Sequence, residues 1–317
     1  MLHNLFYKLA EVPHEEGLVI TQGTFDGVHR GHQTVLKQVV ATAQAHHKKS
    51  LLLTFHPHPR LVINPNDQSL RTLQSIEEKA KSVFALGIDY VLVLPFTEEI
   101  SKKSPAQFVE DILVNALNVS TMVVGYDHRF GHNRSGGFEE LTRLGKSFGF
   151  EVLEIEANLI EAIAVSSSRI RRALMEGNIS DANQLLGSTY LLTGMVEKGK
   201  ELGRTIGFPT ANIAINDPYK LIPAHGVYCG FARINDTQIP MLCNIGPQPT
   251  VNGKDTKIEA HLLDFNQDLY NQTITLGLVQ FLRKIERFES LEALKKQLIS
   301  DREQAIELLT SKNLIAH

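Results

Sequence analysis

"GTFDGVHRGHQ", residues 23–33, follows directly on the apolar run "LVIT" (residues 18–21) and sets our interpretation of this chain. In an open parallel sheet, ligands bind where the loop after a strand meets the amino end of the next helix. Glycines in such a loop let the backbone approach a polyphosphate, and the helix terminus supplies N–H groups and partial positive charge. If the segment from His29 onward is helical, its three-residue spacing places His29 and His32 on one face. One phosphate group could then contact both imidazoles.

The histidine pair has two other interpretations at this point. Histidines bind zinc, but a structural zinc site needs four ligands, and the nearby histidine-rich places are only "HH" (46–47) and "HPHP" (56–59). A solvated surface pair is commoner for an isolated HxxH pattern. Isolated pairs, however, are not usually framed by glycines behind a strand, so the composite motif favours phosphate binding.

Short β-rich runs alternate with helical patterns from about residue 18 to residue 185. This alternation predicts an α/β fold with a parallel, Rossmann-like sheet covered by helices on both faces. The expected strands are residues 18–21, 50–55, 90–96, 121–126 and 150–156. The expected helices are residues 31–46, 75–86, 105–117 and 138–148. Two further helices are expected after Ser166, N-capped by Ser166 or Ser167 and then by Ser180, and ended by Gly177 and Gly187.

The sequence pattern changes near Gly187. From Tyr190 to about Val279 the apolar runs are short, alternating and punctuated by glycine and proline, which predicts antiparallel strands in a small β-barrel. From about Ser290, leucines at near-helical spacing that begin with Leu291 predict a long C-terminal helix. We therefore expect two domains, residues 1–186 and residues 187–317.

Composition limits the partners of this chain. The 317 residues carry a formal charge of −3, so there is no global basic field, and we expect small substrates rather than nucleic acid. No apolar run approaches the roughly 18–20 residues that span a bilayer, and the first residues lack the apolar core of a signal peptide. We expect no membrane association, a cytoplasmic location, and Cys229 and Cys243 as reduced, buried thiols. Weak self-association is left open.

Two more motifs of the first half contain groups that bind anions. "GYDHRFGHNRSGG" (125–137) follows an expected strand and carries Asp127, Asn133 and Arg134 on a glycine-rich loop that could hold a ribose and phosphates. "SSSRIRRAL" (166–174) places Arg171 in the first turns of a helix, where arginine opposes the helix dipole. That arrangement makes more sense when an anion binds there.

The barrel half has its own candidate site in "GRTIGFPTANI" (203–213) and "EAH" (259–261). Thr210 and Asn212 alternate along an extended segment and would face the same way, and hard oxygen ligands suit Mg²⁺ on a nucleotide phosphate. Glu259 could accept the proton of an attacking hydroxyl, or it could be an exposed strand carboxylate. "GMVEKGKE" (194–201) resembles a Walker A loop but ends in Glu201 instead of Ser or Thr, so we reject that interpretation.

Together these motifs resemble a known family. "GTFDGVHRGHQ" is similar to the HxGH signature of nucleotidyltransferases, and with "TFHPHP", "GYDHRFGHNRSGG" and "SSSRIRRAL" it resembles the FMN adenylyltransferase half of bacterial bifunctional FAD synthetases. "GRTIGFPTANI", "HGVYCGFA", "CNIGPQPTVNG", "IEAHLLDFNQDLY" and "FLRKIERF" resemble the riboflavin kinase half. The resemblance covers nearly the whole chain.

The resemblance implies two reactions. Riboflavin and ATP would give FMN and ADP in the barrel, and FMN with a second ATP would give FAD and pyrophosphate in the α/β domain, with Mg²⁺ as cofactor. The implied catalytic residues are Glu259, His29, His32 and Arg171, and the implied Mg²⁺ ligands are Thr210 and Asn212. The implied contacts with ATP and its phosphates are Gly23, Phe25, Asp26, Gly31, Gly125, Asp127, Arg134, Ser167, Ser168, Gly203, Arg204 and Gly207. The implied flavin contacts are Phe55, Pro57, His58, Pro59 and Asn133.

The chain departs from the family pattern at His128, Ser168 and Ala260, where the family often has Phe, Thr, and Thr or Val. Serine keeps the hydroxyl group, whereas His128 could alter how the flavin or adenine packs. Two rival functions stay open. One is an HxGH cytidylyltransferase with a regulatory barrel, and the other is a flavin sensor without catalytic activity.

Overall fold

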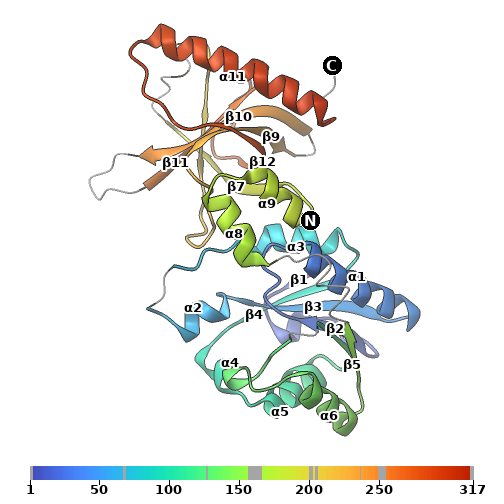
Figure 1. Cartoon of the computed structure of the whole chain (residues 1–317). Helices are drawn as coiled ribbons and strands as arrows, with labels where there is room; N and C mark the ends of the chain where they lie inside the picture. The colour runs from blue at the N-terminus through green and yellow to red at the C-terminus, as the bar shows by residue number, and fades with distance from the viewer. Residues whose placement is uncertain are drawn as a thin grey trace. The chain divides into compact units, whose positions relative to one another are not determined.

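The structure is a computed structural model that describes residues 3–66, 69–125, 128–155, 166–199, 203, 206–235, 237–248 and 255–314. The chain divides into two compact units, residues 1–167 and residues 168–317. Figure 1 shows their elements, and each unit is described by itself. None of the described helices is long and apolar enough to cross a membrane.

The first unit contains a six-stranded sheet of order β1-β4-β3-β2-β5-β6, in which every pairing is parallel. The strands are β1 (Leu5–Phe6), β2 (Leu18–Gln22), β3 (Lys49–His56), β4 (Tyr90–Pro95), β5 (Val119–Gly125) and β6 (Glu151–Ile155). The predicted parallel sheet is confirmed. The chain leaves β2 toward β3 on one side and later returns to β5 on the other, so the carboxyl end of β2 is the switch point where such folds bind ligands.

Helices cover both faces of this sheet. Helix α1 (Arg30–Ala45) and helix α3 (Ile76–Phe84) pack on the face that carries Val19. Helix α5 (Pro105–Phe108), the π-helix η2 (Val109–Ala116) and helix α6 (Phe138–Phe148) pack on the face that carries Leu18 and Ile20. Successive side chains of β2 thus enter opposite cores, which explains its unbroken apolar sequence.

Several short elements were not predicted. They are η1 (Leu9–Glu11), α2 (Pro59–Ile63), α4 (Glu98–Lys102) and η3 (His132–Arg134), together with β1. The helix expected over residues 105–117 is present, but its second part has π-helical hydrogen bonding. Elements of two to five residues carry too few periods for a hydrophobic pattern to identify them.

The second unit is built on a closed barrel of order β10-β11-β8-β7-β12-β9 with antiparallel pairing throughout. Its strands are β7 (Tyr190–Glu197), β8 (Ala211–Ala214), β9 (Gly226–Ile234), β10 (Thr237–Gln248), β11 (Asp255–Leu262) and β12 (Thr273–Arg283). The predicted antiparallel barrel is confirmed.

Two helices precede the barrel and contact it. The backbone N–H of Ala224 donates to the carbonyl of Leu174 in α8 (Ser167–Met175) at 3.0 Å, and the Nδ2 of Asn183 in α9 (Ile179–Leu186) donates to the carbonyl of Leu278 at 2.8 Å. The compact unit therefore begins at residue 168. A functional boundary after residue 186 stays a prediction.

The predicted cap of α9 is wrong. The side chain of Asn178 accepts the hydrogen bond from the Asp181 N–H at 3.3 Å, and Ser180 lies inside the helix. Asn178 has the stronger claim because it stands immediately before the first helical residue. Gly187 ends α9 in the left-handed conformation with φ 74°, as expected.

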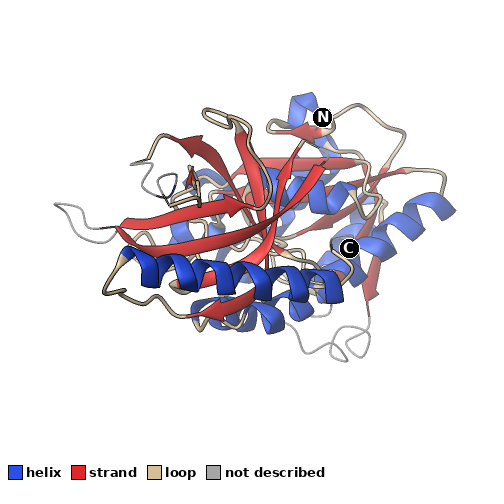
Figure 2. Cartoon of the chain, turned by 90° about the horizontal axis from the view of Figure 1, so that it is seen from above, coloured by secondary structure: helices blue, strands red, loops and turns tan. Residues whose placement is uncertain are grey.

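Helix α11 (Leu291–Ser311) closes the second unit and begins after its N-cap Ser290. Figure 2 shows it lying along the outside of the barrel strands. Asp301, which is 1% exposed, accepts hydrogen bonds from the Arg283 guanidinium at 2.8–3.1 Å and so ties the helix to β12. Leu291 is 64% exposed, which contradicts its place in the predicted apolar stripe, because α11 joins the barrel core through its C-terminal half, at Ala305 and Leu309, and not through its first turn.

Candidate functional site

The loop after β2 brings His29 and His32 together at the start of α1. His29 is the N-cap residue, 6% exposed, and its Nδ1 accepts a hydrogen bond from the backbone N–H of His32 at 3.4 Å. The two imidazole rings stack, with centroids 3.6 Å apart and 15° between their planes. The expected juxtaposition is confirmed, although His29 precedes the first helical residue.

His32 is a neutral imidazole at pH 7. Burial lowers the pKa of His32 well below its usual 6.5, and electrostatic interactions with His29 and Lys79 lower it further. The ring of Phe25 lies 4.9 Å from that of His32, between ring centroids. The Nδ1 atom of His32 is buried without a hydrogen-bond partner among the described residues. His32 therefore offers a hydrogen-bonding group to a ligand rather than a fixed charge.

Lys79 of α3, which the sequence analysis did not select, contacts the same loop. Its side chain is 6% exposed, and Nζ donates to the carbonyl of Thr24 at 2.7 Å and to Oγ1 of Thr54 at 3.5 Å. Burial lowers the pKa of Lys79, and the negative charge of Asp26 opposes that shift. A lysine four residues before the core residue Val83 was the signal that could have revealed it.

Asp26 joins three segments of the first unit. Its carboxylate accepts the backbone N–H of Leu73 at 2.9 Å and 3.1 Å, and its carbonyl accepts Oγ–H of Ser167 at 2.9 Å. Asp26 is 3% exposed. This geometry favours positioning of the loop over a direct phosphate contact by the carboxylate, which would also repel an anion.

Three predicted phosphate-binding glycines of the first unit lie in the loop of residues 23–33 or at the end of the neighbouring strand β5. Gly23 donates its N–H to the carbonyl of Leu53 at 3.0 Å, Gly31 is buried in the first turn of α1, and Gly125 ends β5, the neighbour of β2. Asn133 is exposed in η3 with φ 53°. Two further predicted ligands cannot be placed: Asp127 lies outside the described residues, as does the side chain of Arg134.

Phe55, predicted to contact a flavin, is 6% exposed at the end of β3. Its ring lies 5.4 Å from that of Phe96 and 6.4 Å from that of Phe108, which is core packing. Three other predicted flavin contacts follow at once around the start of α2, namely Pro57, His58 and Pro59, whereas the fifth, Asn133, lies in η3. A flavin contact by any of them stays a prediction.

The structure also describes His128, where the chain departs from the family pattern, and two predicted site residues of α8. His128 stacks on Phe130, with ring centroids 5.7 Å apart. Ser168 is exposed and Arg171 is half-buried in α8. Both α8 residues belong to the second unit, so a role beside the histidine pair stays a prediction for Arg171.

The barrel holds a second polar cluster around Glu259 of β11. Glu259 pairs across the sheet with Asn212 of β8 on one side and with Asn244 of β10 on the other. Its Oε1 lies 2.6 Å from Nζ of Lys257, and its Oε2 accepts a long hydrogen bond from Nδ2 of Asn244 at 3.5 Å. Residues directly opposite in antiparallel strands share a face. Glu259 and Asn212, which sequence motifs predicted separately, are therefore brought together.

Close approach of other atoms requires a glycine at position 203, in the predicted nucleotide motif, and at position 199, which precedes that motif. A Cβ added to Gly199 would lie 2.0 Å from Nδ2 of Asn212, and one added to Gly203 would lie 2.1 Å from the carbonyl oxygen of Phe208. Thr210 is exposed immediately before β8. Gly207 is exposed with φ 85°, and Arg204 lies outside the described residues.

In the described part of the chain, the two cysteines form no disulfide bond. Cys229 and Cys243 are free and fully buried, as predicted. Burial raises the pKa of Cys229 to about 11 and that of Cys243 to about 12, so both are inert thiols. Among the described residues, no group of three or more His, Cys, Asp or Glu side chains could hold a metal ion.

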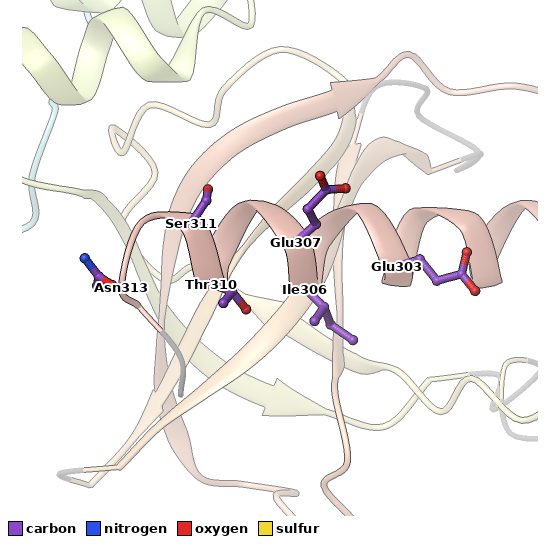
Figure 3. Close-up of a pocket in the computed structure, with 6 residues that line it drawn as sticks. All are labelled: Glu303, Ile306, Glu307, Thr310, Ser311 and Asn313. Atoms are coloured by element: carbon purple, nitrogen blue, oxygen red, sulfur yellow. The ribbon is translucent and has the colours of Figure 1, made fainter. Parts of the chain in front are cut away.

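A hollow of about 640 Å³ lies along the C-terminal half of α11 (Figure 3). Its lining is Glu303, Ile306, Glu307, Thr310, Ser311 and Asn313. All of these belong to one helix and its C-terminal end, and none is a predicted site residue, so we assign it no function.

Comparison with known proteins follows the same division of the chain. The model of the FAD synthetase family matches residues 11–169, and that of the riboflavin kinase family matches residues 186–309. The chain is 36% identical over 296 residues to the bifunctional riboflavin kinase/FMN adenylyltransferase of Escherichia coli (strain K12), which covers 93% of each chain. It is 38% identical over 284 residues to the protein of the same name from Listeria monocytogenes serovar 1/2a, which covers 89% of this chain and 90% of that one.

A solved structure has the same fold over almost the whole length. It is the crystal structure of a protein named as a macrolide-efflux protein from Streptococcus pneumoniae, with a TM-score of 0.83, 27% identity and coverage of 96% of this chain and 98% of that chain. The two family models and the curated relatives agree on both activities. The chain thus belongs to the bifunctional riboflavin kinase/FMN adenylyltransferases, enzymes that phosphorylate riboflavin to FMN with ATP and convert FMN with a second ATP to FAD and pyrophosphate.

Proposed function

We propose that residues 187–317 phosphorylate riboflavin at the cluster around Glu259 and that residues 1–186 adenylylate FMN at the loop of residues 23–33. The ranges of the two family models support this division. The observation that carries the kinase assignment is the direct pairing of Glu259 with Asn212 across two barrel strands. It puts a carboxylate and a neutral oxygen ligand on one face.

Glu259 is the proposed general base of the kinase reaction. Its carboxylate accepts the proton of the 5′-hydroxyl of riboflavin as that oxygen bonds to the γ-phosphorus of ATP. The bond between the γ-phosphorus and the β,γ-bridging oxygen breaks, and ADP leaves. Asn244 on the neighbouring strand β10 and Lys257 on β11 itself both contact the carboxylate and hold it in place.

The residues of β8 fit a magnesium ion. The Oδ1 atom of Asn212 is buried and has no hydrogen-bond partner among the described residues, and an amide oxygen is a hard ligand of the kind Mg²⁺ takes. We assign the ion to Asn212 and Thr210. When bound, it would neutralise charge on the phosphates of ATP.

In adenylyl transfer, an oxygen of the FMN phosphate bonds to the α-phosphorus of ATP while the bond to the β-phosphate breaks and pyrophosphate leaves. The nucleophile is already anionic at neutral pH, so the site needs no general base and no covalent intermediate. It has to align two anions and stabilise the charge that moves to pyrophosphate. His29, His32, the N-terminus of α1 and Arg171 are the proposed groups, and the buried ammonium of Lys79 adds positive charge behind the loop.

Three expectations about the surroundings of the enzyme remain part of this proposal. A cytoplasmic location fits two buried, reduced thiols. The formal charge of −3 fits small substrates better than nucleic acid. Weak self-association stays open.

The experiment that tests the proposal incubates the purified protein with riboflavin, ATP and Mg²⁺ and separates the flavins by chromatography over time. FMN should appear before FAD. Unchanged riboflavin with supplied FMN still becoming FAD would remove the kinase assignment. Preference for CTP over ATP would favour the cytidylyltransferase, and tight flavin binding without turnover would favour the sensor.

A further inference from the structure

The proposed base of the kinase site is held by a cation in the ligand-free protein. Nζ of Lys257 lies 2.6 Å from Oε1 of Glu259, and the two side chains are 30% and 25% exposed. Both residues stand on β11, two positions apart, so they share one face of the strand. Among the described residues, the other carboxylate oxygen has only the 3.5 Å contact with Asn244.

The contact with Lys257 competes with the proposed role of Glu259 as general base. The ammonium of Lys257, 2.6 Å from Oε1, occupies the carboxylate oxygen that a substrate hydroxyl would have to reach. The ion pair therefore has to weaken before the carboxylate can serve the substrate.

The barrel provides a competing partner for the ammonium. Asn212, opposite Glu259 on β8, is where we place the phosphates of ATP, and a polyphosphate carries several negative charges against the single charge of a carboxylate. Lysine is a flexible side chain with a compact charge and three donors, so it can exchange one anion for another. The residue opposite Lys257 on β10 is Gly246, which has no side chain to pack against the lysine.

We propose that Lys257 is a positioning residue that couples ATP binding to release of the base: it holds Glu259 in the free enzyme and moves to the phosphates of ATP, leaving the carboxylate for the 5′-hydroxyl of riboflavin. This inference rests on the proposed function of Glu259. It implies an order in the site, since riboflavin gains its hydrogen bond to Glu259 only after the nucleotide has drawn the cation away.

The test measures riboflavin binding to the full chain by flavin fluorescence, with and without a non-hydrolysable ATP analogue and Mg²⁺. The analogue should tighten riboflavin binding about fivefold, the coupling expected when one partly exposed ion pair is exchanged. Thermodynamic reciprocity requires riboflavin to tighten binding of the analogue by the same factor.

Variants separate coupling from a structural effect. Lys257→Met should bind riboflavin more tightly than the wild type without nucleotide and show no enhancement with it. Lys257→Arg, which keeps the cation, should retain the enhancement. Lys295→Met removes an exposed lysine of α11 and should leave the enhancement unchanged. In the Glu259→Gln background, Lys257→Met should not change riboflavin binding any further, because the ion pair is already gone.

Persistence of the enhancement in Lys257→Met, or its absence in the wild type, would overturn the proposal. If Lys257→Met does not fold, as judged by circular dichroism, Lys257→Gln provides the same measurement with a polar side chain. The proposed function itself is tested by a different measurement: it fails if the wild type forms no FMN from riboflavin and ATP. FMN formation without coupling therefore rejects only the role of Lys257.

Discussion

His29 and His32 stack face to face, 3.6 Å between ring centroids, at the N-terminus of α1. The contact arises because His29 is the N-cap and its Nδ1 accepts the N–H of His32, which draws the two rings together one turn apart. If both stacked imidazoles were positively charged, they would repel each other. The pair therefore enters the reaction with at least one neutral ring, and burial selects His32.

Replacement of His32 should separate the two activities. His32→Ala should slow conversion of FMN to FAD by about 10²–10³, the loss typical of one charge-stabilising contact, and leave FMN formation from riboflavin unchanged. Chromatography of the flavins measures both rates in one reaction. Lys37→Ala, an exposed position on the same helix, is the control and should change neither rate. Loss of both activities in folded His32→Ala would contradict the division of the chain.

The stability of the protein should decrease on acidification because of His32. Its pKa is about 6.5 in the unfolded chain and lies well below that in the folded protein. Between these two values the unfolded chain binds a proton that the folded protein does not, so the free energy of unfolding falls as pH falls. Above pH 6.5 His32 is neutral in both the folded and the unfolded chain, so this loss of stability is absent. Urea unfolding at pH 7.5 and 5.5 should show a smaller decrease for His32→Gln than for the wild type, and equal decreases would contradict the shift.

Glu259→Gln should have the opposite selectivity to His32→Ala. Glutamine keeps the size of the side chain and one acceptor oxygen but cannot accept a proton, so FMN formation should fall by about 10²–10⁴. Supplied FMN should still be converted to FAD at the rate of the wild type. A variant that still phosphorylates riboflavin at the original rate would remove Glu259 from the mechanism.

Gly199→Ala should impair the kinase reaction through Asn212. The added Cβ would lie 2.0 Å from Nδ2 of Asn212, the flexible end of a side chain, so the amide would rotate away at little loss of stability. We expect the KM for ATP in FMN formation to rise while thermal unfolding changes little. The FMN-to-FAD reaction of the same sample is the internal control. An unchanged KM would show that the position of Asn212 does not matter for nucleotide binding.

The ion pair between Arg283 and Asp301 should dominate the attachment of α11. Asp301→Ala leaves a buried guanidinium without its partner and should lower the free energy of unfolding by about 3–5 kcal/mol. The matched control is Asp264→Ala, which removes an exposed pair with Arg302 and should lower it by about 1 kcal/mol or less. Chemical denaturation measures both. Equal losses would mean that burial of Asp301 contributes nothing.

Much of the fold follows from local sequence. The parallel sheet was predictable because β2, β3, β4 and β5 contain apolar runs flanked by helical patterns, and the barrel because its runs are short and alternate. Two predictions failed: Asn178 and not Ser180 caps α9, and Leu291 is exposed instead of packing on the barrel.

The candidate sites were predictable only in part. Motif spacing found His29 and His32 in a glycine-rich loop, Asn212 in "GRTIGFPTANI" and Glu259 in "EAH", because each motif lies within a short stretch of chain. Lys79 and Lys257 were missed because their importance depends on partners from other elements, the carbonyl of Thr24 and the carboxylate of Glu259. The spacing of Lys79 from Val83 places it on the buried face of α3 but does not identify the group it contacts.

The sequence by itself determined the two-part architecture, the phosphate-binding loop and the family of this protein, since all three rest on patterns within short stretches of chain. The tertiary structure alone decided which groups meet. It set strand β11 against β8, so that Glu259 faces Asn212, and buried Lys79 beside the loop of His32. Register between distant strands and the burial of a charge depend on the whole packed unit, and for that reason protonation of His32 and the hold of Lys257 on Glu259 could be read only from the folded chain.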